Sequence, residues 1–179
     1  MRILLRISGL IDAANEGIGK LVYWLVLVAV LVSAGNAVIR YSINYSSNAW
    51  LELQWYLFSA IFLLCSGYTL LRNEHIRIDI ILGRFSRRVQ AAVDIFGILF
   101  FLFPMAILIM WLSWPMFMDS FRTHEMSSDA GGLIRWPAKL LVPVGFFLLT
   151  AQGFSELIKR IAFLAGFTDE PGAKMHSHS

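Results

Sequence analysis

The stretch IFGILFFLFPMAILIMWLSWPMFM, residues 95–118, runs for 24 residues without a charged side chain. An α-helix rises 1.5 Å per residue, so about 20 apolar residues cross the roughly 30 Å hydrocarbon core of a bilayer. The stretch shows no alternation of apolar and polar residues, as a strand of a membrane barrel would. It therefore predicts a membrane-spanning helix. The whole chain agrees, because 58% of its 179 residues are hydrophobic and only 15% are charged, whereas soluble domains have about 25% charged residues.

Three further uncharged runs have the same character. The runs at 21–39 and 53–71 are long enough to span as they stand, and the run at 140–155 becomes long enough if Lys139 and Glu156 lie at its ends. Backbone polar groups in lipid must be satisfied within their own segment, so the spans must be helical. We predict an all-α integral membrane protein, with a single membrane domain over residues 1–165 and a disordered tail over residues 166–179. The predicted transmembrane helices cover residues 21–40, 51–71, 92–118 and 138–160.

The basic residues indicate how the helices are oriented. With four spans, the N-terminal segment, the second loop and the C-terminal tail share one side of the membrane and carry 11 of the 15 Lys and Arg residues. The first and third loops carry the other 4. Cytoplasmic loops are enriched in Lys and Arg. We therefore predict that both termini lie in the cytoplasm.

Two segments outside the spans are amphipathic. Residues 3–18 place apolar side chains at helical spacing, with Asp12, Asn15 and Glu16 on the other side, which predicts a helix lying in the membrane interface. The alternative is that these residues simply extend the first span. Residues 72–90 combine five arginines with apolar residues at similar spacing, and we expect this segment to lie along the cytoplasmic face.

The spans offer no evident site for catalysis. A charge near the bilayer centre costs about 2.5–3.5 kcal/mol on insertion scales, so such residues usually signal function. Here the acidic residues Glu52, Asp94 and Glu156 stand at span ends, and Lys159 and Arg160 follow Glu156 closely enough to form helix-end ion pairs. No histidine falls inside a span, and the single cysteine excludes a disulfide within the chain. We predict no enzyme activity, no cofactor and no metal site. A formal charge of +3 also gives no basis for binding nucleic acid.

Two short motifs flank the second span. The sequence NAWLELQ, residues 48–54, opens that span, and RNEHIRID, residues 72–79, follows it directly. With four spans and inward termini, these motifs resemble the small membrane subunit (Q-type, DctQ-like) of TRAP transporters, the tripartite ATP-independent periplasmic transporters. The second motif resembles the family's pattern of His, an aliphatic residue, any residue, an aliphatic residue and Asp. Asn36 and Arg40, at the outer end of the first span, also fit, and the resemblance covers roughly residues 20–160.

The resemblance implies a function that composition alone does not give. In this family a soluble periplasmic protein captures an organic acid, and a large membrane subunit carries it inward, driven by a sodium gradient. The small subunit resembles a static scaffold bound lengthwise to the large one. We therefore expect a non-catalytic accessory subunit in the inner membrane of a bacterium. Its expected partners are the large membrane subunit, the periplasmic substrate-binding protein and the lipid bilayer, and sodium coupling is expected in the large subunit.

Two alternatives from other classes remain open. A membrane-anchor subunit of a respiratory or redox complex would carry paired histidines or cysteines at depth, and the spans lack them. A self-sufficient small transporter acting as an oligomer would need an acidic residue within a span, and only Glu52 could serve.

The candidate site is a set of residues near helix ends, which we interpret as a subunit interface or a structural polar cluster. Arg40 ends the first span and Glu52 begins the second, so we expect them to lie close together or to meet the partner subunit together. His75 and Asp79 are four residues apart, which places them on one face of a helix, as a helix-end pair or a partner contact. The full set is Asn36, Arg40, Trp50, Glu52, Gln54, His75, Arg77 and Asp79.

Overall fold

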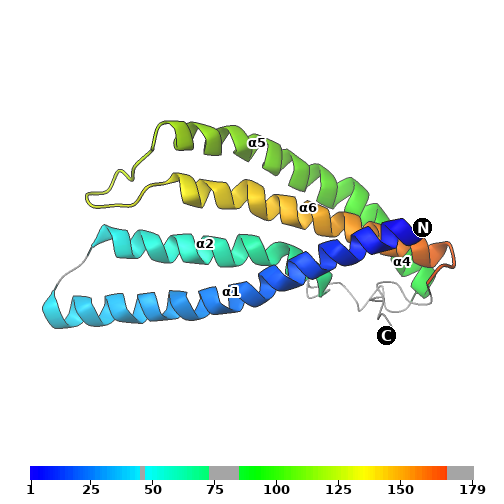
Figure 1. The fold of residues 1–179 in the computed structure, drawn as a ribbon, viewed down its shortest axis with the longest axis horizontal. Helices are drawn as coiled ribbons and strands as arrows, with labels where there is room; N and C mark the ends of the chain where they lie inside the picture. Colours follow the sequence, from blue (N-terminus) through cyan, green and yellow to red (C-terminus); the bar gives the residue numbers. More distant parts are fainter. Residues whose placement is uncertain (45–46, 73–84, 169–179) are drawn as a thin grey trace.

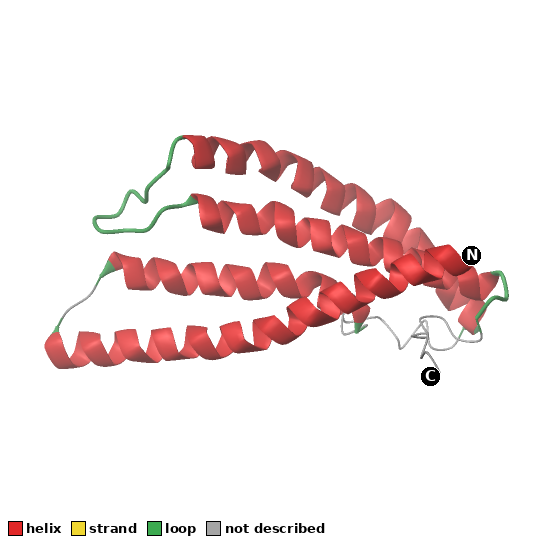
Figure 2. Ribbon diagram, in the orientation of Figure 1, coloured by secondary structure: helices red, strands yellow, loops and turns green. Residues whose placement is uncertain are grey.

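The computed structural model of the protein describes residues 1–44, 47–72 and 85–168, and Figures 1 and 2 show the arrangement of their helices. Four helices in this part of the chain are long and apolar enough to cross a membrane, which confirms the prediction. Each predicted span lies within one of them. Most of the arginine-rich segment, residues 73–84, and the tail from residue 169 lie outside the described residues. In chain order the elements are α1 (Arg2–Ile43), α2 (Asn48–Leu71), α4 (Arg87–Gly97), the π-helical η1 (Ile98–Leu102), α5 (Phe103–Arg122) and α6 (Trp136–Leu164).

The last helix, α6, is the element around which the others pack. It contacts α1, α2, α4, η1 and α5, and it lies between α2 and α5 in Figure 1. Helices in lipid associate closely through small residues. A Cβ on Gly145 would lie 2.8 Å from both the Cβ and the carbonyl oxygen of Leu63, and a Cβ on Gly153 would lie 2.9 Å from Leu102 and Phe103. The two glycines therefore allow α2 and the third long helix to approach α6 closely.

The first helix, α1, is continuous over 42 residues, and this corrects the prediction of a separate helix over residues 3–18. The backbone follows the alternative, in which these residues extend the first span. The buried face also differs from the expectation. Asp12 and Asn15 are buried against the bundle, whereas Ile3 and Leu10 are 74% and 72% exposed. The physical reason is that the polar side chains of α1 find hydrogen-bonding partners on α6, so the apolar ones turn outward.

The third long helix contains a π-helical segment next to a proline. The elements α4, η1 and α5 follow one another without a break from Arg87 to Arg122. Pro104 has no N–H to donate, and the N–H of Phe103 donates to the carbonyl of Ile98, five residues back. Prolines and π-bulges are common causes of local helix distortion, so the irregularity is explained by the sequence at this position.

The two ends of the bundle carry different features. The loop of residues 123–135 and the start of α2 lie at one end, here called the loop end (Figure 2). The start of α1, the start of α4 and the end of α6 lie at the other, here called the terminal end. Between the ends, large apolar side chains such as Phe62, Phe100 and Trp111 are exposed. This is the surface expected of a protein that meets lipid or another membrane protein.

Candidate functional site

Glu52, in the first turns of α2, organises the loop end. The residue is only 6% exposed. Its carboxylate accepts hydrogen bonds from the hydroxyl of Ser127 and from the backbone N–H of Leu133, the latter over 2.6 Å. A buried carboxylate without such partners would be costly. The charge of Glu52 therefore fixes the 123–135 loop over the end of α2.

The 123–135 loop is closed by antiparallel backbone hydrogen bonds. The N–H of Ser127 donates to the carbonyl of Leu133 over 3.0 Å, and the N–H of Arg135 donates to the carbonyl of Glu125 over 2.9 Å. The turn between them requires a residue without a side chain, because a Cβ on Gly132 would lie 2.7 Å from the hydroxyl oxygen of Ser127. These contacts give the loop a compact, hydrogen-bonded shape.

Two more side chains of α2 hold the same loop. The hydroxyl of Tyr56 donates to the carbonyl of Ile134 over 3.1 Å, and the amide of Asn48 donates to the carbonyl of Ala130 over 3.0 Å. Asn48, Glu52 and Tyr56 lie on three successive turns of α2 and contact the loop at different points. The position of the loop relative to that helix is therefore fixed as well as its internal shape.

An ion pair holds the loop to α6. The ammonium group of Lys139, in the first turn of α6, contacts the carboxylate of Glu125. The hydrogen bond from Lys139 holds the pKa of the Glu125 carboxyl below its ordinary value of 4.5. Glu125 lies in the loop, outside the membrane-spanning helices, so its carboxyl responds to the pH of the surrounding solution.

Of the predicted polar residues, those that the structure describes lie on α1 and α2. Glu52 is paired with the loop, and Arg40 is exposed near the end of α1 and is not its partner among the described residues. Asn36 is buried one turn earlier, Trp50 is 40% exposed and Gln54 is half-buried. Joint contact of Arg40 and Glu52 with a partner subunit stays a prediction. The remaining predicted residues lie outside the described residues: His75, Arg77 and Asp79.

A second polar cluster is buried at the terminal end, where α1, α4 and α6 meet. The Nζ of Lys159 lies 3.0 Å from Oδ2 of Asp12 and 2.5 Å from Oε1 of Glu156. Arg160 contacts the other oxygen of Glu156, and its Nε lies 2.8 Å from Oδ2 of Asp94. Five charged side chains thus form one chain of ion pairs across three helices. We call these five residues the charge network.

Uncharged groups extend the charge network between α1 and α6. The side-chain amide of Gln152 donates to Oδ1 of Asp12 over 2.8 Å and accepts from Nδ2 of Asn15 over 2.9 Å. The hydroxyl of Ser155 lies 2.6 Å from the same oxygen of Asp12 and 2.7 Å from the hydroxyl of Ser8. All of these residues are buried. The first turns of α1 are therefore fastened to α6 by polar contacts.

The sequence predicted one part of the charge network and missed another. The helix-end ion pairs of Glu156 with Lys159 and Arg160 are confirmed. Their burial was not expected, and the interpretation of residues 3–18 as an interfacial helix placed Asp12 on its polar outer side. A signal was present, because residues 8, 12, 15 and 19 are small or polar and share one helical face. Such a stripe is typical of a packing surface between membrane helices.

The chemistry of the two clusters is that of structural cross-links. Within the described part of the chain, the buried charges of the network are paired with one another, and Glu52 is bound to the loop. No group of three His, Cys, Asp or Glu side chains among these residues is placed to hold a metal ion. Paired buried charges hold helices in one arrangement and are costly to break from one side. The fold and these clusters thus define a multi-pass helical membrane protein whose helices are locked together at both ends.

Comparison with protein families identifies the chain more closely. Residues 29–163 match the DctQ component of the tripartite ATP-independent periplasmic transporters. The match covers most of the chain, so the protein belongs to this family and is a membrane subunit of a TRAP transporter, as its motifs suggested. The redox anchor and the self-sufficient carrier are accordingly not favoured. Neither the curated proteins nor the solved structures gave a match to this chain.

Proposed function

We propose that this chain is the non-catalytic scaffold subunit of a sodium-gradient-driven, binding-protein-dependent transporter that imports an organic acid, a carboxylate. Family membership supports the transporter. The observation that carries the scaffold role is the pairing of the buried charges of the described residues within the chain itself. A site that carries a charged substrate across the bilayer needs polar groups near the bilayer centre, whereas these paired charges lie at the terminal end of the bundle. The large membrane subunit then provides the substrate and sodium sites.

Two surfaces suit the two expected partners. The exposed apolar side chains along α5, such as Leu108 and Trp111, suit packing against the large membrane subunit. The 123–135 loop faces the periplasm in the predicted orientation and suits contact with the substrate-binding protein. A loop already held in one conformation loses little freedom on binding, and Glu52 provides that restraint. Arg40 and Trp50, which are exposed at the same end, are the predicted residues best placed to join such contacts.

Reconstitution tests the proposed function. The purified chain is placed in liposomes under an inward sodium gradient, and uptake of a panel of labelled mono- and dicarboxylates is measured. We expect no uptake by this chain alone, uptake once the large subunit and the binding protein are added, and loss of that uptake when this chain is left out. Uptake by the chain alone would refute the scaffold role. Full uptake by the large subunit and the binding protein in the absence of this chain would show that this chain is not required for transport.

A pair of surface variants tests which partner meets the loop. Met126, in the 123–135 loop, is 59% exposed, and Phe167, at the terminal end, is 64% exposed. We expect Met126→Asp to require more binding protein for half-maximal uptake, with an unchanged yield of the membrane complex. Phe167→Asp is the matched control at the opposite end and should behave like the parent. Equal effects of both variants would argue against docking at the loop.

A further inference from the structure

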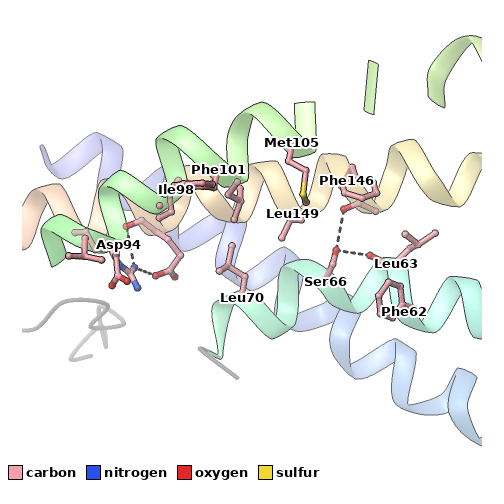
Figure 3. Close-up of a pocket in the computed structure, with 16 residues that line it drawn as sticks. Phe62, Leu63, Ser66, Leu70, Asp94, Ile98, Phe101, Met105, Phe146 and Leu149 are labelled. Carbon is pink, nitrogen blue, oxygen red and sulfur yellow. Dashed lines mark hydrogen bonds and ion pairs between the residues drawn. The ribbon is translucent and has the colours of Figure 1, made fainter. Parts of the chain in front are cut away.

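An apolar groove of about 650 Å³ runs along α6 and has no role in the proposed function (Figure 3). Phe62 and Leu70 of α2 line one side, Phe101 and Met105 line the other, and Leu149 of α6 lies between them. These residues belong to helices that cross the membrane, so the groove is at membrane depth and its occupant must be apolar.

The groove is apolar along its length and charged at its terminal end. Its lining on α6 runs from Gly145 to Arg160, which is about 22 Å at 1.5 Å per residue. Half of a bilayer with its headgroups measures about 20–22 Å. At the terminal end the lining includes Asp94, Glu156 and Arg160, whereas the Ser66 hydroxyl farther along is bonded to backbone carbonyls. The groove therefore has the length and polarity of one phospholipid in one leaflet.

We propose that this groove binds a phospholipid with an ethanolamine headgroup, taken from the leaflet at the terminal end. The acyl chains lie along the apolar lining, and the headgroup meets the pair formed by Asp94 and Arg160. Nε and Nη1 of Arg160 are engaged with Asp94 and Glu156, whereas Nη2 makes no hydrogen bond to the described residues. Nη2 is therefore the donor for a phosphate oxygen. The side chain of Asp94 is 20% exposed and accepts from the ammonium group.

The charge of the lining selects this headgroup. Two carboxylates and one guanidinium line the terminal end, so the lining itself carries a net negative charge. An anionic headgroup would place its charge beside these two acids, whereas a zwitterionic one can turn its ammonium toward Asp94 and its phosphate toward Arg160. A choline ammonium has no N–H to donate, but an ethanolamine ammonium has three. The hydrogen bond to a carboxylate is charge-assisted and strong.

The walls of the groove favour a lipid over a helix of another protein. Membrane helices pack closely where small residues line the interface. Here the walls carry Phe62, Phe101 and Met105, which are 79%, 69% and 52% exposed, and the small residue Gly145 is already covered by Leu63. Flexible acyl chains fit between bulky side chains without requiring a flat surface.

Native mass spectrometry of the full chain in mild detergent tests the proposal. Titration uses phosphatidylethanolamine, phosphatidylglycerol and phosphatidylcholine with matched acyl chains. Gly97 lines the groove, and a Cβ there meets nothing within 4 Å, so Gly97→Phe starts a bulky side chain from an open position on the groove wall. Gly35 is equally open but lies on α1, away from the groove. We expect phosphatidylethanolamine to bind preferentially to the parent and to Gly35→Phe, and Gly97→Phe to lose this binding.

Asp94→Asn tests the headgroup contact. The amide retains a hydrogen-bonding group beside Arg160 and removes the charge, so binding of phosphatidylethanolamine should weaken about tenfold, and the preference over phosphatidylglycerol should vanish. Lipid binding that is unchanged in Gly97→Phe, or that shows no headgroup preference in the parent, would overturn the proposal. In the assembled transporter, a photo-crosslinker at Met105 should capture lipid. Capture of the large subunit instead would show that a protein helix occupies the groove.

Discussion

The Nζ of Lys159 lies 3.0 Å from Oδ2 of Asp12, although the two residues are 147 positions apart in the chain. Asp12 is 8% exposed and Lys159 is 6% exposed. The ion pair therefore joins the first helix to the last one in a place that water does not readily reach. Because Glu156 and Arg160 continue the network to Asp94 of α4, the position of three helices at the terminal end depends on the same few charges.

We predict that Lys159→Met strongly destabilises the protein. The substitution leaves Asp12 and Glu156 buried without their shared cation, and removal of one partner from a buried pair costs about 3–5 kcal/mol. The measurement is the melting temperature of the purified chain in detergent. Lys20→Met is the control. The Lys20 side chain is 72% exposed and lies 3.8 Å from the Glu16 carboxylate, and exposed ion pairs contribute only about 0–1 kcal/mol to stability. The double variant Asp12→Asn with Lys159→Met should recover part of the loss. A parental melting temperature for Lys159→Met would show that the network is not stabilising.

We predict that Glu52→Ala releases the 123–135 loop without unfolding the bundle. The variant removes the acceptor of the Ser127 and Leu133 hydrogen bonds, so amide hydrogen exchange in residues 127–133 should become faster while exchange in α5 stays slow. Glu52→Gln should have a smaller effect, because it retains one acceptor oxygen. Asp119→Asn is the control, since Asp119 is an exposed acid at the end of α5. Equal exchange in Glu52→Ala and the parent would mean that the loop is held by its other contacts.

The sequence predicted the elements well and their contacts poorly, for a physical reason. A membrane span is a local property, because its length and apolar composition can be read from one stretch such as residues 95–118. The partner of a polar residue is not local: Glu52 meets Ser127 from 75 positions away. The polar face that contains Asp12 could turn either to water or to another helix, and a single sequence does not distinguish the two. The ion pairs around Glu156 were predictable because their members lie within one helical turn.

We predict opposite effects for two glycine substitutions. A Cβ on Gly145 would lie 2.8 Å from a backbone oxygen of Leu63, whereas a Cβ on Gly17 meets nothing within 4 Å. Gly145→Ala forces α2 and α6 apart, and overpacking of this kind costs about 1–3 kcal/mol. Gly17→Ala gains helix propensity, worth up to about 1 kcal/mol, and meets no obstacle. The melting temperature should fall for Gly145→Ala and stay level or rise for Gly17→Ala. A fall of equal size in both would show that close packing is not the cause.

We predict that the 123–135 loop loosens only in acid. Lys139 lowers the pKa of the Glu125 carboxyl below 4.5, so their ion pair stabilises the loop at any pH above that value and is lost as the pH falls through the lowered pKa. Cleavage of the loop by an acid-tolerant protease should therefore be constant above pH 4.5 and faster below it. In Lys139→Met the pKa of Glu125 returns toward its ordinary value, so less stabilisation is lost in acid and the rise in cleavage below pH 4.5 should be smaller. An equal rise in both proteins would show that Lys139 does not set the titration.

We predict that the loop end faces the periplasm and the terminal end faces the cytoplasm. The prediction follows from the split of 11 Lys and Arg residues against 4, and the structure makes it testable because Gly166 follows α6 and Ala130 lies in the 123–135 loop. Alkaline phosphatase should be active when it is fused at Ala130 and inactive when it is fused at Gly166. A reporter that fluoresces only in the cytoplasm should be dark at Ala130 and bright at Gly166. The same result at both positions would contradict a single crossing by α6. Opposite sides in the reverse sense would keep the fold but invert the protein, and would place the proposed lipid in the other leaflet.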